Sequence, residues 1–341
     1  MLSIYLIPFF VAMFLAINMG GSGTAASFSA AYGANLLRKD LIPGLFGIFV
    51  FLGAIFAGKK VVLTMSGGIL PSSTITFTLT IIILLSVSIS LFIANLLRVP
   101  QSTSQAAVFA LVGPAIYFNL LQTKKLLFEI VPSWFLLPIL AFFITLLIGK
   151  FIYKPIKQRE LFNFEKLSVH PTLKIIVIGA SFYGAFAVGA NNVANAAGPI
   201  AAMIMNELQI APGGDDFVLI MIVTTLIIAP CFAIGSSIFG RRVIETPGRE
   251  IIGFGPLGAT YISLITATLL LLASITRGIP TCGVQINVMA IMGLGVAKVG
   301  WKEISKRTSV RKLITVWFIS PLIALGLSYF LTLAADKLDI L

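Results

Sequence analysis

The chain has 341 residues, of which 58% are hydrophobic and only 11% charged, and its mean hydropathy is clearly positive. A soluble domain normally carries about 25% charged residues, so this composition excludes a soluble globular protein. The net charge of +12 does not indicate nucleic-acid binding, because the Lys and Arg residues lie in the gaps between apolar runs. That placement is typical of membrane proteins.

The first half of the chain consists of apolar segments. A membrane-spanning helix needs about 20 mostly apolar residues. Five such elements occur in chain order, at roughly 2–37, 41–58, 74–97, 100–121 and 126–153. The N-terminal run has no basic residue before it, so we expect a retained membrane segment and not a cleavable signal peptide.

The second half repeats this organisation after a polar stretch at 154–174. Five more elements follow, at roughly 175–205, 217–239, 257–276, 279–299 and 314–335. The sequence therefore predicts an all-α polytopic membrane protein with one repeat at 1–153, a cytoplasmic linker at 154–174 and a second repeat at 175–341. Gly, Pro, Ser or Asn interrupt the elements at 2–37, 100–121, 175–205 and 279–299, which predicts broken or re-entrant helices at the centre.

The basic residues test this arrangement. With five elements per half and the linker in the cytoplasm, both termini lie outside and the second half is inverted relative to the first. Only six of the 24 basic residues then lie outside, which is the positive-inside bias. These six are Lys59, Lys60, Lys124, Lys125, Arg277 and Lys337.

Three short patterns occur in the same order in both halves. A run of small residues lies at 20–27 and 189–196, and Gly followed by two basic residues begins the segments 58–64 and 240–246. The third pattern is Pro-Gln-Ser-Thr-Ser-Gln at 100–105 and Pro-Thr-Cys-Gly-Val-Gln at 280–285. Three matches in one order indicate duplication. Inverted repeats with interrupted segments are typical of secondary transporters, which bind substrate at those segments.

The third pattern suits an anion. Pro at a helix start, followed by Ser102, Thr103 and Ser104, presents backbone N–H groups and hydroxyls at the positive end of a helix dipole. The second half offers Thr281, then Cys282 and a glycine. Simple N-capping by these side chains is the alternative. For the runs of small residues, close helix packing is the alternative to a binding role.

Other chemistry is not indicated. All twelve acidic residues fall in loops or near span ends, so no proton relay is evident. The chain shows no Ser/His/Asp grouping, metal-ligand cluster or phosphate loop, so we do not expect an enzyme. Cys231 and Cys282 lack metal-type spacing and are expected to be reduced thiols. Arg98 and Arg277 precede the two prolines, where each either attracts an anion or extends to the membrane interface.

Two patterns resemble signatures of the inorganic phosphate transporter family. Residues 189–196, Gly-Ala-Asn-Asn-Val-Ala-Asn-Ala, resemble its Gly-Ala-Asn-Asp-x-Ala-Asn-Ala motif, and residues 100–105 resemble its Pro-x-Ser-[Ser/Thr]-Thr-[His/Gln] motif. The resemblance implies a homodimeric, cation-coupled oxyanion symporter of the cell membrane. The implied substrate contacts are Ser22, Gly23, Ser102, Thr103, Asn191, Asn192, Thr281 and Cys282. The implied coupling-ion or supporting residues are Gln105, Asn195 and Gln285, with Asn191 and Asn195 as candidate Na⁺ ligands.

Departures from the family motif indicate the substrate. The family has an Asp where this chain has Asn192, and the matching first-half position is Gly23. Phosphate near neutral pH carries an O–H that a carboxylate can accept, whereas sulfate carries none and would meet a carboxylate as a like charge. Residues 20–33 also resemble the sulfate-permease branch of the family. We therefore expect sulfate import, with a phosphate:sodium symporter and an anion channel as alternatives. No cofactor is expected, and oxygen ligands without acids favour Na⁺ over H⁺ as coupling ion.

Overall fold

All regular elements of the described residues are helices. The computed structural model describes residues 6–33, 37–38, 40–97, 101–153, 171–240 and 255–341. Arg98, Pro100, residues 154–170 of the predicted linker, and the second Gly-basic pattern beyond Gly240 lie outside the described residues.

The helices of the two halves follow one another in a similar order. The first half contains α1 (Leu6–Gly33), α2 (Ile42–Ala57), α3 (Lys59–Gly67), η1 (Ser72–Thr74), α4 (Phe77–Leu96), α5 (Thr103–Tyr117), α6 (Thr123–Lys125), η2 (Leu126–Ile130), α7 (Val131–Ile148) and η3 (Gly149–Tyr153). The second contains α10 (Pro171–Asn192), α11 (Ala194–Leu208), α12 (Asp215–Gly235), η4 (Ser236–Gly240), α14 (Pro256–Arg277), α15 (Gly283–Val299), α16 (Trp301–Ser305) and α17 (Thr308–Lys337).

Each of the ten predicted apolar elements corresponds to a helix or a helix pair. Within the described ranges, seven helices are long and apolar enough to cross a membrane, or eight if α2 and α3, bent by 75°, form one span. The remaining two, α5 and α15, have 15 and 17 residues. At 1.5 Å per residue they are shorter than the roughly 30 Å hydrocarbon core, which agrees with the prediction of broken or re-entrant helices at the centre.

The first interrupted element differs from the prediction, because α1 is one unbroken helix. Its glycines serve close packing. A Cβ on Gly20 would overlap the backbone of Phe232 in α12, and one on Gly21 would overlap Phe239 in η4. The corresponding element of the second half is interrupted at one residue, Val193, between α10 and α11, and residues 171–208 together form one candidate span. Gly20 and Gly21 of the first run of small residues therefore serve helix packing.

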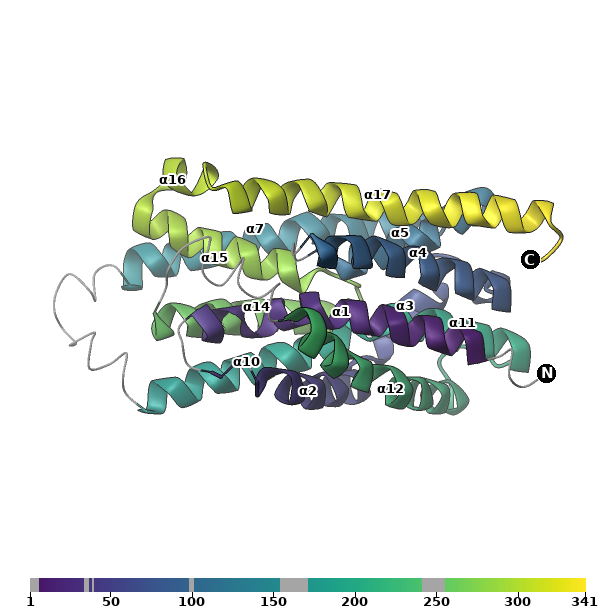
Figure 1. The fold of residues 1–341 in the computed structure, drawn as a ribbon, viewed down its shortest axis with the longest axis horizontal. Coiled ribbons are helices and arrows are strands. Elements are labelled where there is room, and N and C mark those ends of the chain that lie inside the picture. Colours follow the sequence, from purple (N-terminus) through teal and green to yellow (C-terminus); the bar gives the residue numbers. More distant parts are fainter. Residues whose placement is uncertain (1–5, 34–36, 39, 98–100, 154–170, 241–254) are drawn as a thin grey trace.

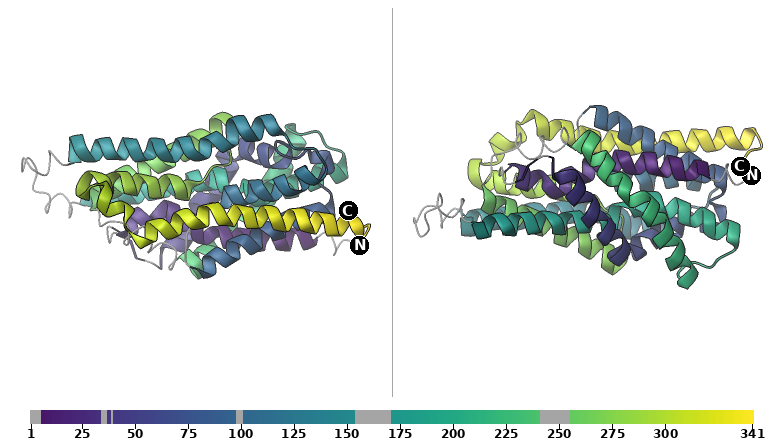
Figure 2. Two further views of the ribbon diagram at one scale, coloured as in Figure 1. Left: turned by 90° about the horizontal axis from the view of Figure 1, so that it is seen from above. Right: turned by 60° about the horizontal axis from the view of Figure 1, so that its bottom comes forward.

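Several of the large packing contacts join the two halves reciprocally. Helix α1 packs against α12 and α10 against α2, while α5 packs against α17 and α15 against α7. Figure 1 shows the start of α1 and the end of α17 at one end of the bundle, and the start of α10 at the other. Figure 2 shows that most long helices follow one common axis. This exchange of partners supports the predicted inverted duplication and brings the starts of α5 and α15 to the interior.

Candidate functional site

The starts of α5 and α15 meet inside the bundle. Ser102 caps α5, its Oγ accepting from the Gln105 N–H at 3.2 Å, and Cys282 caps α15, its Sγ accepting from the Gln285 N–H at 3.3 Å. The Ser102 side chain also hydrogen-bonds Cys282. Both side chains therefore cap their helices. This capping leaves the other first-turn N–H groups without intrahelical partners, at the positive ends of two converging dipoles.

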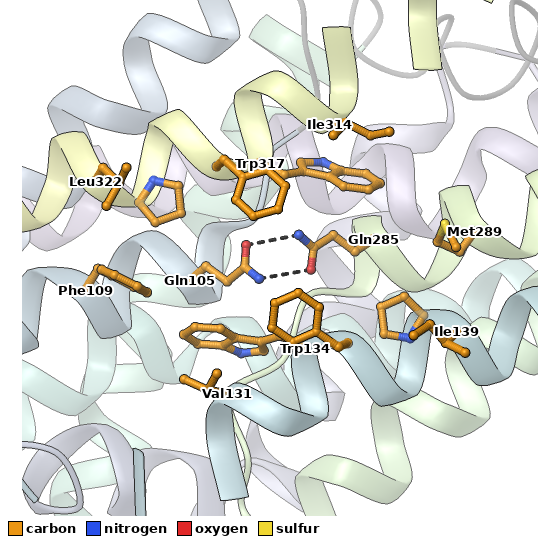
Figure 3. Close-up of a pocket in the computed structure, with 14 residues that line it drawn as sticks. Gln105, Phe109, Val131, Trp134, Ile139, Gln285, Met289, Ile314, Trp317 and Leu322 are labelled. Carbon is orange, nitrogen blue, oxygen red and sulfur yellow. Dashed lines mark hydrogen bonds between the residues drawn. The ribbon is translucent and has the colours of Figure 1, made fainter. Parts of the chain in front are cut away.

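The glutamines of the two motifs hold the helix starts together. Gln105 Nε2 donates to Gln285 Oε1 at 3.1 Å, and Gln285 Nε2 donates to Gln105 Oε1 at 3.0 Å (Figure 3). Because each amide satisfies the other, the pair acts as a link between the two halves. Each amide oxygen accepts one hydrogen bond from the other glutamine.

Asn191 joins three elements through all of its polar atoms. Its Nδ2 donates to Ser274 Oγ at 2.8 Å and to the Ile279 carbonyl at 2.9 Å. Its Oδ1 accepts from the Thr281 N–H at 3.0 Å and from Ser104 Oγ at 3.3 Å. The side chain is fully buried. Asn191 thus fixes the end of α10 against α14, the start of α15 and the start of α5.

Asn195 and side chains of α1 also lie close to the starts of α5 and α15. Asn195 Nδ2 donates to Ser104 Oγ at 3.2 Å and contacts Met19 Sδ at 3.9 Å. On the same helix as Met19, the Ala26 Cβ lies 3.7 Å from the place of a Cβ on Gly283. Ser22 is three residues after Met19 and four before Ala26, so all three share one face of α1. Ser22 therefore faces the α10–α11 break and the start of α15.

Four buried polar atoms of this region have no hydrogen-bond partner: Ser22 Oγ, Thr281 Oγ1, Asn192 Oδ1 and Asn195 Oδ1. Their residues are at most 4% exposed. Burying such an atom unpaired costs about 1–3 kcal/mol, and a ligand that bonds these atoms would offset that cost. Two of the atoms are hydroxyls that can donate to an anion, and two are amide oxygens that can bind a cation. We call this group the central site.

The remaining predicted residues lie around the central site in different ways. Thr103 is buried in the first turn of α5. At Gly23 an added Cβ would meet Phe46 and Val188, so this residue serves helix packing. Ser104, which bonds both Asn191 and Asn195, is missing from the predicted contacts although it belongs to the motif at 100–105. The sequence feature that could have identified Ser104 is that it is the third hydroxyl residue of that motif. Both cysteines are free, as predicted.

A larger cavity of about 370 Å³ lies beside the glutamine pair (Figure 3). Its lining is almost entirely apolar; the amides of Gln105 and Gln285 bond each other, and Trp134 Nε1 donates to the Pro280 carbonyl. Its walls are paired between the halves: Trp134 of α7 lies across the glutamine pair from Trp317 of α17 (Figure 3), and Pro138 and Pro321 of the same helices also line the cavity. The pairing is a further sign of duplication. Because this cavity is lined mostly by apolar side chains, the central site is the candidate for anion binding.

Comparison with known proteins gives three similarities. The pattern of the phosphate transporter family matches residues 19–328. The sulfate permease CysP of Bacillus subtilis (strain 168) is 35% identical over 333 residues, which cover 96% of this chain and 87% of the relative. A solved sodium-dependent phosphate transporter shares the fold, with a TM-score of 0.81 over 98% of this chain and 99% of that chain at 23% identity.

Proposed function

This chain belongs to the phosphate transporter family, and from this premise we propose that it imports sulfate together with Na⁺. It is a multi-pass membrane protein. The family is one of transporters, and the sulfate permease of B. subtilis is the 35% identical relative. The observation that carries the proposal is the central site. There, buried hydroxyls and helix-start amides converge, with no Asp, Glu or His among its residues.

The donors of the central site suit sulfate. Sulfate only accepts hydrogen bonds, and Ser22 Oγ and Thr281 Oγ1 are buried hydroxyls without a partner. The converging starts of α5 and α15 add backbone N–H groups and positive dipole ends. A carboxylate at Asn192 would repel a dianion, and the chain has none there. Phosphate is the second candidate, because the unpaired Asn192 Oδ1 can accept its O–H.

The free amide oxygens suit the coupling cation. Importing a dianion against 100 mV costs about 4.6 kcal/mol, so at least two cations must accompany it. Asn192 Oδ1 and Asn195 Oδ1 are the unpaired oxygens of the site, and hard cations prefer oxygen ligands. Asn191 is fully engaged in protein hydrogen bonds, so we assign the Na⁺ contact to Asn195. The residues present thus fit Na⁺.

The arrangement favours alternating access over a channel. The central site is buried between the short helices α5 and α15, which belong to different halves. Rearrangement of the helices around the central site would open it to each side in turn. The homodimer and the outside position of both termini stay predictions.

Uptake into vesicles tests the proposal. Purified protein in proteoliposomes is given radiolabelled sulfate under an imposed Na⁺ or H⁺ gradient, with unlabelled phosphate as competitor. We expect saturable uptake that collapses without the Na⁺ gradient and that excess phosphate barely inhibits. Phosphate inhibition as strong as that by unlabelled sulfate would refute the assigned substrate. Conductance independent of the cation would show a channel instead.

A second prediction concerns Asn192→Asp. The new carboxylate faces the substrate, so we expect kcat/KM for sulfate to fall at least tenfold, about 1.4 kcal/mol, while phosphate competition improves. Asn119→Asp is the matched control, because Asn119 is exposed and remote in sequence from the central site. Equal sulfate uptake by both variants would mean that Asn192 does not face the anion.

A further inference from the structure

A second concavity, of about 230 Å³, is lined by Lys60, Leu63, Thr64, Gly68, Lys125 and Arg277. We call it the basic vestibule. Its three cations come from three separate elements, namely α3, α6 and the last residue of α14. No acidic residue lines it.

The charges of the basic vestibule are only partly compensated. Lys125 Nζ lies 3.9 Å from Glu129, and both side chains are about one-third exposed. Lys60 Nζ donates to the Thr276 carbonyl at 3.2 Å, which places it at the end of α14 beside Arg277. In the part of the chain that the structure describes, neither Lys60 nor Arg277 forms an ion pair with a carboxylate. Like charges that share a cavity repel, so an anion between them would stabilise the arrangement.

The three cations of the basic vestibule belong to the small group of basic residues that are predicted to lie outside. Lys60, Lys125 and Arg277 are three of the six basic residues predicted outside, on the face that the positive-inside bias depletes of cations. Snorkelling alone would scatter such residues over the lipid boundary. Here half of the outside basic residues line one cavity.

The basic vestibule is joined to the central site by a short connection. Arg277 ends α14, Gly278 follows in the left-handed conformation with φ of 62°, and the Ile279 carbonyl accepts from Asn191. Thr281 comes only four residues after Arg277, so their Cα atoms are at most about 14 Å apart. The left-handed turn at Gly278 directs the chain from the vestibule to Thr281, whose hydroxyl is unpaired in the central site.

We infer that the basic vestibule is an outer binding site for the free oxyanion substrate, sulfate, which it captures before the anion enters the central site. The inference rests on the proposed transport function and adds its entry route. A positively charged concavity raises the local concentration of an anion by about tenfold or more. The phosphate group of an anionic lipid has the same chemistry and is the alternative occupant that the experiment must separate.

The first experiment measures uptake of external sulfate by intact cells. One variant combines Lys60→Gln, Lys125→Gln and Arg277→Gln, and the matched control combines Lys59→Gln, Lys124→Gln and Lys337→Gln. Both lose three charges from the same predicted face, but the control residues do not line the cavity. We expect KM to rise about tenfold in the first variant with unchanged maximal rate, and less than about twofold in the control. Added salt should raise KM of the unmodified protein and of the control, but not KM of the first variant. Equal KM changes in both variants would overturn the inference.

The second experiment measures binding without transport. Protein in nanodiscs of neutral phosphatidylcholine is treated with phenylglyoxal, and modification of the exposed Arg277 is read by mass spectrometry with and without sulfate. Protection of Arg277 by sulfate supports the inference that the basic vestibule binds the anion. If sulfate protects Arg277 but the unmodified protein does not transport sulfate, only the proposed function is wrong. Protection that requires phosphatidylglycerol and ignores sulfate assigns the basic vestibule to lipid and overturns the inference. Protection by sulfate without the KM change excludes the entry route.

Discussion

At the residue scale, the backbone N–H and the hydroxyl of Thr281 have different partners. Its backbone N–H donates to Asn191 Oδ1 and helps to fix the start of α15, whereas its hydroxyl is buried without a partner. The backbone therefore carries the structural role of this position. The hydroxyl is left for a ligand, and the free protein loses stability by burying it unpaired.

Thr281→Val removes this hydroxyl and keeps the branched shape. We expect the melting temperature in detergent to stay equal or rise, because an unpaired buried group is lost, while KM for sulfate rises about fivefold to tenfold. Thr281→Ser should restore uptake. A fall in melting temperature with unchanged KM would show that the hydroxyl has a structural partner and no contact with substrate.

At the element scale, glycine pairs set the approach of helices from different halves. A Cβ on Gly189 of α10 would overlap the Val50 carbonyl of α2, and one on Gly53 of α2 would overlap the Phe186 carbonyl of α10. Gly20 of α1 and Gly235 of α12 make the same exchange. Both neighbouring groups are backbone, so neither can move aside as a side chain would. These contacts bring Asn191 and Ser22, which follow the glycines, to the central site.

Gly189→Ala tests this packing against a control in the same helix. The added methyl meets backbone, so we expect a loss of about 1–3 kcal/mol in stability and a matching fall in uptake. Gly179→Ala, where no atom lies within 4 Å, should be neutral or stabilising by up to about 1 kcal/mol. Equal melting temperatures for the two variants would exclude close packing as the role of Gly189.

At the scale of the whole molecule, the two ends of the bundle differ in charge. Helix α16 and the basic residues before α17 lie at the end opposite to the C-terminus (Figure 1). The positive-inside bias assigns this end to the cytoplasm. The described structure is therefore compatible with both termini outside.

Cysteine labelling tests this orientation. Asp339→Cys should react with a membrane-impermeant maleimide in intact cells, whereas Lys302→Cys should react only after permeabilisation. Both positions are exposed, and the native Cys231 and Cys282 are at most 3% exposed, so the background should be low. The reverse labelling pattern would invert the topology.

The sequence by itself predicted much of this protein. Apolar length, loop charge and repeated motifs are local properties, so ten elements and two halves could be recognised, and the family resemblance is confirmed by the comparisons. The contacts of the central site and the substrate stay predictions. The sequence could not distinguish Asn191 from Asn195, since only packing decides that Asn191 is fully hydrogen-bonded while Asn195 keeps a free oxygen.

Only the tertiary structure decided the remaining features. An unbroken α1 depends on helices that press against its glycines, and the basic vestibule depends on three cations separated by long stretches of chain. Local patterns report how a segment interacts with its solvent, water or lipid. Which buried polar group finds a partner, and which charges share a cavity, follow from the packing of distant segments.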